Sequence, residues 1–286
     1  MSAFVRSRLR LTLIAPVLLG ACLALGAGCY LGDFGGDYKY KESFSKTLPL
    51  PADGAFSLKN TNGVVRVSTW SQPEVEIKAE KSAGRESDLE RLKIEVESGA
   101  REVKVDTIYP RRPFFRGKVT YDVRVPEGAR LELVRTTNGN VELTGRYSDV
   151  RAGTTNGGVR VEGAEGTLEV FTTNGSIRVQ DVVGRVKANT TNGGITLTLK
   201  AVKDEIRAGT TNGSITLRVE GDLNADVVAR TTNGRVSTDF PITVQGAISS
   251  RRRIEGKIGA GGPQIELHTT NGSIRITNRP AGERVR

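Results

Sequence analysis

The sequence predicts an all-β protein, a single-stranded β-solenoid (β-helix) of about eleven coils with repeats of 18–21 residues. Three observations predict this class. The tetrapeptide TTNG occurs seven times, apolar and polar residues alternate on both sides of each copy, and only short turns separate the copies. Strands that recur at such a short period must stack on their neighbours to bury an apolar face.

The N-terminal segment has the pattern of an export signal. Arg6, Arg8 and Arg10 precede an apolar run over 11–25, which is shorter than the roughly 20 residues of a membrane-spanning helix. Small residues stand before Cys22 and before Cys29, as in the lipobox of bacterial lipoproteins. We expect a signal peptide over 1–28, a lipid on Cys29 or Cys22, and a chain exported to the periplasm or cell surface. An ordinary secretory signal is the alternative.

The charge balance points to anionic partners. The net charge is +10, and removing residues 1–28 takes away three arginines and no acids, which leaves +7. A basic envelope protein is drawn to anionic polymers, acidic glycans or lipid head groups. Another envelope protein is a further candidate partner. Nucleic acid would suit the charge but not the compartment, so we expect none.

The expected domains follow from where the repeat begins and ends. A Gly-rich tether over 29–45 leads to the solenoid over 46–278, with irregular coils over 70–127, TTNG coils over 128–278 and a tail over 279–286. From Asn138 onward the Asn residues are spaced by 18, 18, 18, 20, 21 and 38 residues. We interpret the last gap as two coils, and the 76 residues from Asn62 to Asn138 as four coils of 19.

Each coil is expected to contain two strands, one before and one after its Asn. Apolar residues stand three and five positions after each Asn, and again six and four positions before it. Continuing the alternation places Thr154 inward, Thr155 outward and Asn156 inward, with Gly157 at a corner that needs a positive φ. Stacked Asn side chains would then form a hydrogen-bonded ladder. The expected members are Asn138, Asn156, Asn174, Asn192, Asn212, Asn233 and Asn271.

Two segments interrupt the repeat between Trp70 and Val125. Ser87 and Glu90 have capping-box spacing, which predicts a short helix over 88–93 at one end of the stack. A basic loop follows, and it is either an exposed interaction loop for an anionic membrane or acidic glycan, or a loop folded back with its Phe residues buried, which we favour. Its candidate residues are Arg111, Arg112, Phe114, Phe115, Arg116 and Lys118.

A third insertion over 248–263 combines Arg251–Arg253 with a Gly-rich run. The spacing of a phosphate-binding P-loop is absent, so we expect a turn-rich hairpin.

The sequence offers little for catalysis. His268 is the only histidine and falls in an outward column, and the acidic residues do not repeat in one column as a metal or two-carboxylate site would. We expect no catalytic residues, no bound metal and no cofactor. A polysaccharide-active β-helix enzyme and a passive structural spacer are the alternatives to a binding module.

Together the lipobox-like start, the opening FSLKNTNGVVRVSTW, the serial TTNG coils and the closing GKIGAGGPQIELHTTNGSIRI resemble a bacterial β-strand-repeat family. Its members are called adhesins or domains of unknown function, and the resemblance covers about 45–278. Some family domains belong to cell-surface proteins that respond to envelope stress. The resemblance implies a β-repeat fold and a non-catalytic, adhesin-like interaction role for a lipoprotein-type member.

Overall fold

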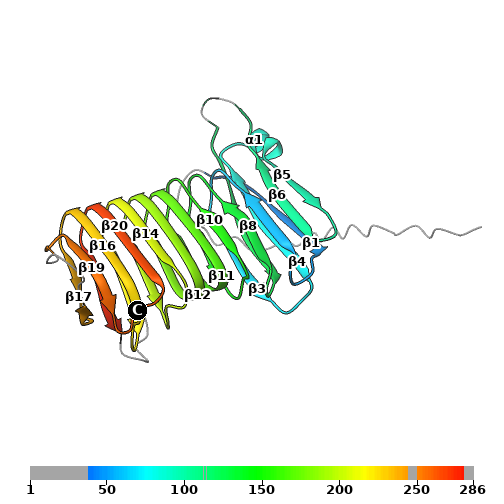
Figure 1. Ribbon diagram of the computed structural model, residues 1–286. Coiled ribbons are helices and arrows are strands. Elements are labelled where there is room, and N and C mark those ends of the chain that lie inside the picture. The colour runs from blue at the N-terminus through cyan, green and yellow to red at the C-terminus, as the bar shows by residue number, and fades with distance from the viewer. Residues whose placement is uncertain (1–37, 112, 114, 244–249, 280–286) are drawn as a thin grey trace, which may run out of the picture. The chain divides into compact units, whose positions relative to one another are not determined.

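The computed structural model describes residues 38–111, 113, 115–243 and 250–279, and these form a stack of β-coils (Figure 1). The described part contains 21 strands and one short helix. The all-β prediction is therefore confirmed. The signal segment, both cysteines, Arg112, Phe114, residues 244–249 and residues 280–286 lie outside the described residues.

Each coil has an upstream strand, which leads into the TTNG corner, and a downstream strand, which leaves it. Strands of neighbouring coils pair in parallel and in register, so that Val159 stands beside Ile177 and Asn174 beside Asn192. In stacking order, the upstream strands are β6 (Glu102–Ile108), β2 (Ala55–Lys59), β8 (Arg130–Arg135), β10 (Val150–Gly153), the second halves of β11 (Val159–Asn174) and β12 (Ile177–Asn192), β14 (Ile206–Asn212), β20 (Gln264–Asn271) and β16 (Ala225–Asn233). The downstream strands are β7 (Gly117–Pro126), β3 (Val65–Trp70), β9 (Val141–Thr144), the first halves of β11 and β12, β13 (Ile195–Leu199), β15 (Ile215–Glu220), β21 (Ile274–Arg279) and β17 (Val236–Thr238).

The core lies between the upstream and downstream strands. The apolar residue three positions after each Asn is at most 7% exposed in every coil. These residues are Val65, Val141, Val159, Ile177, Ile195, Ile215, Val236 and Ile274. Burying one such side chain contributes about 1.5–3 kcal/mol. Because each column touches only the next coil, stability accumulates along the stack.

The coils do not stack in chain order. Strands β2 and β3 pair directly with β8 and β9, so the 76-residue gap before Asn138 contains no coils between them. At the other end, β20 and β21 lie between the β14–β15 coil and the β16–β17 coil, although they come last in sequence. The four-coil and two-coil interpretations of the long gaps, and with them the chain-ordered stack of about eleven coils, are therefore wrong.

Antiparallel strands cover the end of the stack nearest β7. Strand β1 (Tyr40–Pro49) pairs with β4 (Glu74–Ala83), which pairs with β7, and β5 (Lys93–Ser98) pairs with β6. The domain start expected at residue 46 thus falls inside β1. Helix α1 (Glu86–Arg91) lies where a helix was expected but begins earlier, and its N-cap Arg85 makes no side-chain cap bond, so the capping-box interpretation is wrong.

Two further antiparallel strands cover the opposite end. Strand β18 (Ile242–Thr243) pairs with β19 (Arg253–Ile258), and β19 pairs with β16. The expected hairpin over 248–263 is therefore placed wrongly, because β19 is the one described strand in that range and its antiparallel partners, β18 and β16, both precede it in the chain. A Cβ at Gly256 would stand 2.4 Å from the Thr243 carbonyl oxygen, so this close approach of β18 requires glycine.

Candidate functional site

The side chains of the TTNG corners form one continuous edge, which we call the TTNG edge. In each coil the Asn Nδ2 donates to the Oδ1 of the Asn in the adjacent coil, at 2.7–2.9 Å. The order of the Asn residues along the edge is Asn62, Asn138, Asn156, Asn174, Asn192, Asn212, Asn271 and Asn233. All seven bonds run in the same direction, with the donor facing the β7 end.

The Asn residues do not point into the core, contrary to the sequence prediction. Asn156 is exposed, whereas Thr154 is 4% exposed, as expected for an inward side chain. The hydroxyl of this buried Thr donates to the carbonyl of a Gly in the adjacent coil, at 2.9 Å to Gly139. The same bond recurs at 2.8–3.1 Å from Thr136, Thr172, Thr190, Thr210, Thr269 and Thr231. Polar side chains thus hold adjacent corners together from both inside and outside.

The glycine after each Asn is needed because the corners approach closely. A Cβ at Gly175 would stand 1.8 Å from the Gly157 carbonyl oxygen, and one at Gly193 would stand 2.0 Å from that of Gly175. The positive φ predicted for Gly157 is confirmed, at 150°, and adds to the need for glycine at this corner. The same glycines donate their N–H to an Asn carbonyl of the next coil, for example Gly157 to Asn174 at 2.9 Å.

The expected interaction loop covers the first corner of the TTNG edge. Asn62 donates its Nδ2 to the Gly117 carbonyl at 3.2 Å, and the Tyr109 hydroxyl donates to Asn60 Oδ1 at 2.8 Å. Burial raises the pKa of Tyr109 to about 12. The half-buried Phe115 packs edge-on against Tyr109, with ring centroids 5.9 Å apart.

Only part of that loop faces solvent. Arg111 and Arg116 are exposed, and the Lys118 ammonium lies 4.9 Å from the centre of the Tyr38 ring. This agrees with the folded-back alternative for Phe115. Arg112 and Phe114 lie outside the described residues.

The opposite end of the edge carries a group of exposed arginines, which we call the arginine cap. Its members are Arg230, Arg235, Arg251, Arg252 and Arg253. The backbone of this segment covers the last coil, because the Arg252 and Arg251 carbonyls accept from Thr231 N and Val236 N, each at 2.9 Å. The chain therefore fixes three consecutive arginines against the final corner.

One carboxylate lies within this group of positive charges. Glu255 pairs with Arg253, and with Arg230 at 3.5 Å. The hydrogen bond from Arg253 lowers the pKa of Glu255, so this carboxylate is charged at neutral pH. Arg235, Arg251 and Arg252 have no ion pair within the described ranges. Excess positive charge therefore remains available to a ligand.

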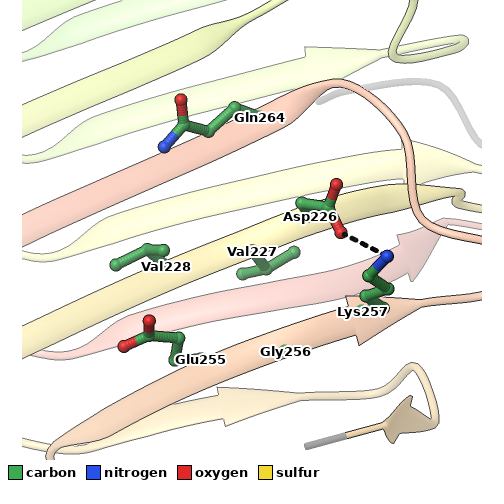
Figure 2. A pocket seen from close by; sticks show the side chains of 7 residues that line it. All are labelled: Asp226, Val227, Val228, Glu255, Gly256, Lys257 and Gln264. Atoms are coloured by element: carbon green, nitrogen blue, oxygen red, sulfur yellow. Dashed lines mark ion pairs between the residues drawn. The ribbon is translucent and has the colours of Figure 1, made fainter. Parts of the chain in front are cut away.

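A surface hollow of about 450 Å³ lies beside the arginine cap, across β19, β16 and β20 (Figure 2). Its lining includes Asp226, Val228, Glu255, Lys257 and Gln264. Asp226 faces Lys257, with Oδ1 and Nζ 4.0 Å apart, and Glu255 is held by the arginines. Both lining carboxylates thus have cationic partners.

His268 is exposed, as predicted, between Gly209 and Arg230 on adjacent strands. The outward Thr column of the TTNG edge is also present, with Thr173, Thr191 and Thr211 exposed. Among the described residues no group of three or more His, Cys, Asp or Glu side chains is placed to hold a metal ion. Nor does that part of the chain contain a helix long and apolar enough to cross a membrane.

The arginine cap was not predicted as a unit. Arg251–Arg253 stood out in the sequence, but Arg230 and Arg235 flank Asn233, and no periodic spacing links the two segments. One signal was available. Arg235 stands two positions after its Asn, where most coils have Ser or Gly.

The stacked coils and their hydrogen-bonded corners define a solenoid-like β-repeat protein. The sequence pattern of the Toastrack DUF4097 family matches residues 55–277, so the chain belongs to this family.

Several solved structures are similar to the chain at a low level. They include a "putative cell adhesion protein" from Clostridium sporogenes (11% identity, 84% of this chain and 100% of that chain, TM-score 0.38). A "putative adhesin" from Bacteroides fragilis has 11% identity over 83% of this chain and 97% of that chain, with a TM-score of 0.37. Another from Parabacteroides merdae has 10% identity over 83% and 96%, with a TM-score of 0.35. No curated protein matches the sequence. Similarity this low carries no information on what the chain binds.

Proposed function

We propose that this protein is a non-catalytic binding module of the bacterial cell envelope, anchored by a lipid on Cys29 or Cys22. Support for the location is the sequence pattern alone: a charged start, an apolar run and small residues before each cysteine. The compact unit that follows spans Asp37–Arg286. An acylated Cys29 would leave a few Gly-rich residues between the membrane and this unit.

The proposed ligand is an anionic polymer of the envelope, bound at the arginine cap. The observation that carries this proposal is the set of five exposed arginines at the last coil, of which only Arg230 and Arg253 pair with Glu255. Guanidinium groups bind carboxylate and phosphate through two parallel hydrogen bonds. Three of the five have no acidic partner within the described ranges, so a ligand would not have to displace an existing ion pair. The paired backbone beneath them keeps the arginines at fixed relative positions.

Co-sedimentation with cell-wall sacculi that retain their anionic polymers tests the proposal. The chain from residue 30 onward would be compared with the variant R235Q/R251Q/R252Q and with R146Q/R160Q/R178Q. The second variant loses the same charge from exposed sites elsewhere on the stack. We expect saturable retention of the wild type and the control variant at low salt, and a clear loss for the cap variant.

Equal losses in both variants would mean that retention follows net charge alone, and the proposed site would be wrong. Retention on anionic lipid vesicles but not on sacculi would replace the polymer with the membrane surface as the partner. Retention on neither sacculi nor vesicles would favour the alternative that the protein is a passive structural spacer.

A further inference from the structure

The eight Asn–Gly sequences of the TTNG edge are chemically alike but differ in how the fold restrains them. Asn–Gly is the sequence most prone to deamidation, because glycine leaves its own nitrogen unhindered to attack the Asn side chain. That attack needs the glycine N–H free of a hydrogen bond and the Asn amide free to turn. Whether the folded protein meets these two conditions differs from coil to coil.

Seven of the eight sequences are restrained twice. Their glycine N–H donates to an Asn carbonyl of the adjacent coil at 2.8–3.0 Å, and their Asn Oδ1 accepts from the adjacent Asn at 2.7–2.9 Å. At Asn212, for example, Gly213 N donates to Asn271 O at 2.9 Å, and Oδ1 accepts from Asn271 at 2.8 Å. Attack at these sites requires both bonds to break first.

Asn233 is the exception, because it belongs to the last coil of the stack. Its Nδ2 donates to Asn271 Oδ1 at 2.8 Å, but within the described ranges its Oδ1 accepts no hydrogen bond and the Gly234 N–H donates none. The covering carbonyls of Arg251 and Arg252 bond Val236 and Thr231, on either side of Gly234, and pass it by. Both Asn233 and Gly234 are exposed.

We infer that Asn233 is a site of selective spontaneous deamidation in the folded protein. The Gly234 nitrogen loses its proton to solvent base and attacks Asn233 Cγ. A C–N bond forms to close a succinimide ring, the Cγ–Nδ2 bond breaks, and ammonia leaves. Water then adds to either ring carbonyl and opens the ring to aspartate or isoaspartate. The reaction consumes one water and involves no oxidation or reduction.

The product places a carboxylate inside the arginine cap. Asn233 is two residues from Arg235, and the Arg251–Arg252 backbone covers its coil. The new charge would pair with these arginines and compete with an anionic ligand. This consequence rests on the proposed function, whereas the deamidation itself does not.

Peptide mapping of the folded chain from residue 30 onward tests the inference. The protein would be incubated at mildly alkaline pH and digested with trypsin, which releases 231–235 with Asn233 and 208–218 with Asn212. The second peptide is a matched control within the same molecule. Attack at Asn212 must first break two hydrogen bonds that Asn233 and Gly234 do not make. We therefore expect Asn233 to deamidate roughly tenfold faster than Asn212, or more. In urea-unfolded protein we expect the two rates to converge.

Equal rates in the folded protein, or a faster reaction at Asn212, would overturn the inference. It would also be overturned if Asn233 stayed intact while the unfolded sample converted fully. Retention of fresh and aged protein on sacculi gives a separate readout. If Asn233 deamidated selectively but retention on sacculi did not change, the deamidation site would be confirmed and the result would count against anion binding at the arginine cap.

Discussion

At the scale of single residues, the corner glycines show how closely the coils approach. In the pair Gly193–Gly194, a Cβ on the first would stand 2.0 Å from the Gly175 carbonyl oxygen, whereas one on the second would be 3.3 Å from that of Ser214. Other coils carry Ser176 or Ser214 at the second position. The first position is therefore restricted to glycine by a neighbouring backbone, and the second is not.

Gly193→Ala is expected to lower the free energy of unfolding by about 3 kcal/mol or more, because backbone must move to relieve the clash. Gly194→Ala is the matched control and should change it by less than about 1 kcal/mol. Urea denaturation of both variants measures the difference. Similar stabilities for the two variants would mean that the corners can separate without cost.

The buried tyrosines make the stability of the fold decrease at alkaline pH. Burial raises the pKa of Tyr109 to about 12, and it also raises the pKa of Tyr121 and Tyr147. Because the fold favours the neutral phenol, these groups contribute stability that is fully present below pH about 10 and is lost as pH rises toward about 12.

Phenolate absorbance should therefore show three of the six tyrosines titrating late in the folded protein, and all six together near pH 10 in urea. Tyr109→Phe should remove one of the late groups. Early titration of all six without loss of the β-sheet signal would contradict the assignment of Tyr109, Tyr121 and Tyr147 as buried.

At the scale of the repeating element, the sequence correctly predicted which strand residues point into the core, but it did not predict the direction of the Asn side chain at the TTNG corner. Period-two alternation placed Val150, Ala152 and Thr154 inward correctly, since one face of each strand is buried. Extending the same alternation to Asn156 failed, because the chain leaves the strand direction at the corner. Alternation is a property of extended backbone and does not continue through a turn.

The Asn ladder should stabilise the middle of the stack more than its end. Asn174→Leu removes two side-chain hydrogen bonds and Asn233→Leu removes one. At about 0.5–1.5 kcal/mol per bond, we expect Asn174→Leu to lower the unfolding free energy by about 1–3 kcal/mol and Asn233→Leu by about half as much. Chemical denaturation measures both. An unchanged Asn174→Leu variant would mean that water replaces the exposed ladder without loss.

At the scale of the whole molecule, the order of the coils could not be read from the sequence. The coils around Asn233 and Asn271 have equivalent inward columns, with Val227 and Ala229 in register with Ile265 and Leu267. Either coil could therefore pack on the β14–β15 coil. The choice depends on β18 and β19, which turn the chain back across β16 before β20 inserts. Such long-range strand pairing leaves no periodic pattern in the sequence from which the order of the coils could be predicted.

Disulfide formation along the outward Thr column tests this order directly. Adjacent strands lie about 4.8 Å apart, within reach of a disulfide, whereas strands two positions apart are separated by about 9.6 Å and are not. Asn212 stands in register with Asn271, so the residues just before them are neighbours too. In a chain from residue 30 onward, which lacks both natural cysteines, we expect T211C/T270C to oxidise readily and T211C/T232C to stay reduced.

The pair T191C/T211C, on coils that adjoin in both chain and stack, serves as the positive control. If T211C/T232C formed the disulfide and T211C/T270C did not, the coils would stack in chain order. Asn271 would then occupy the end of the ladder, with Gly272 unrestrained, and Asn233 would be protected. The cross-linking pattern and the deamidation pattern must therefore agree, because both depend on which coil lies last in the stack.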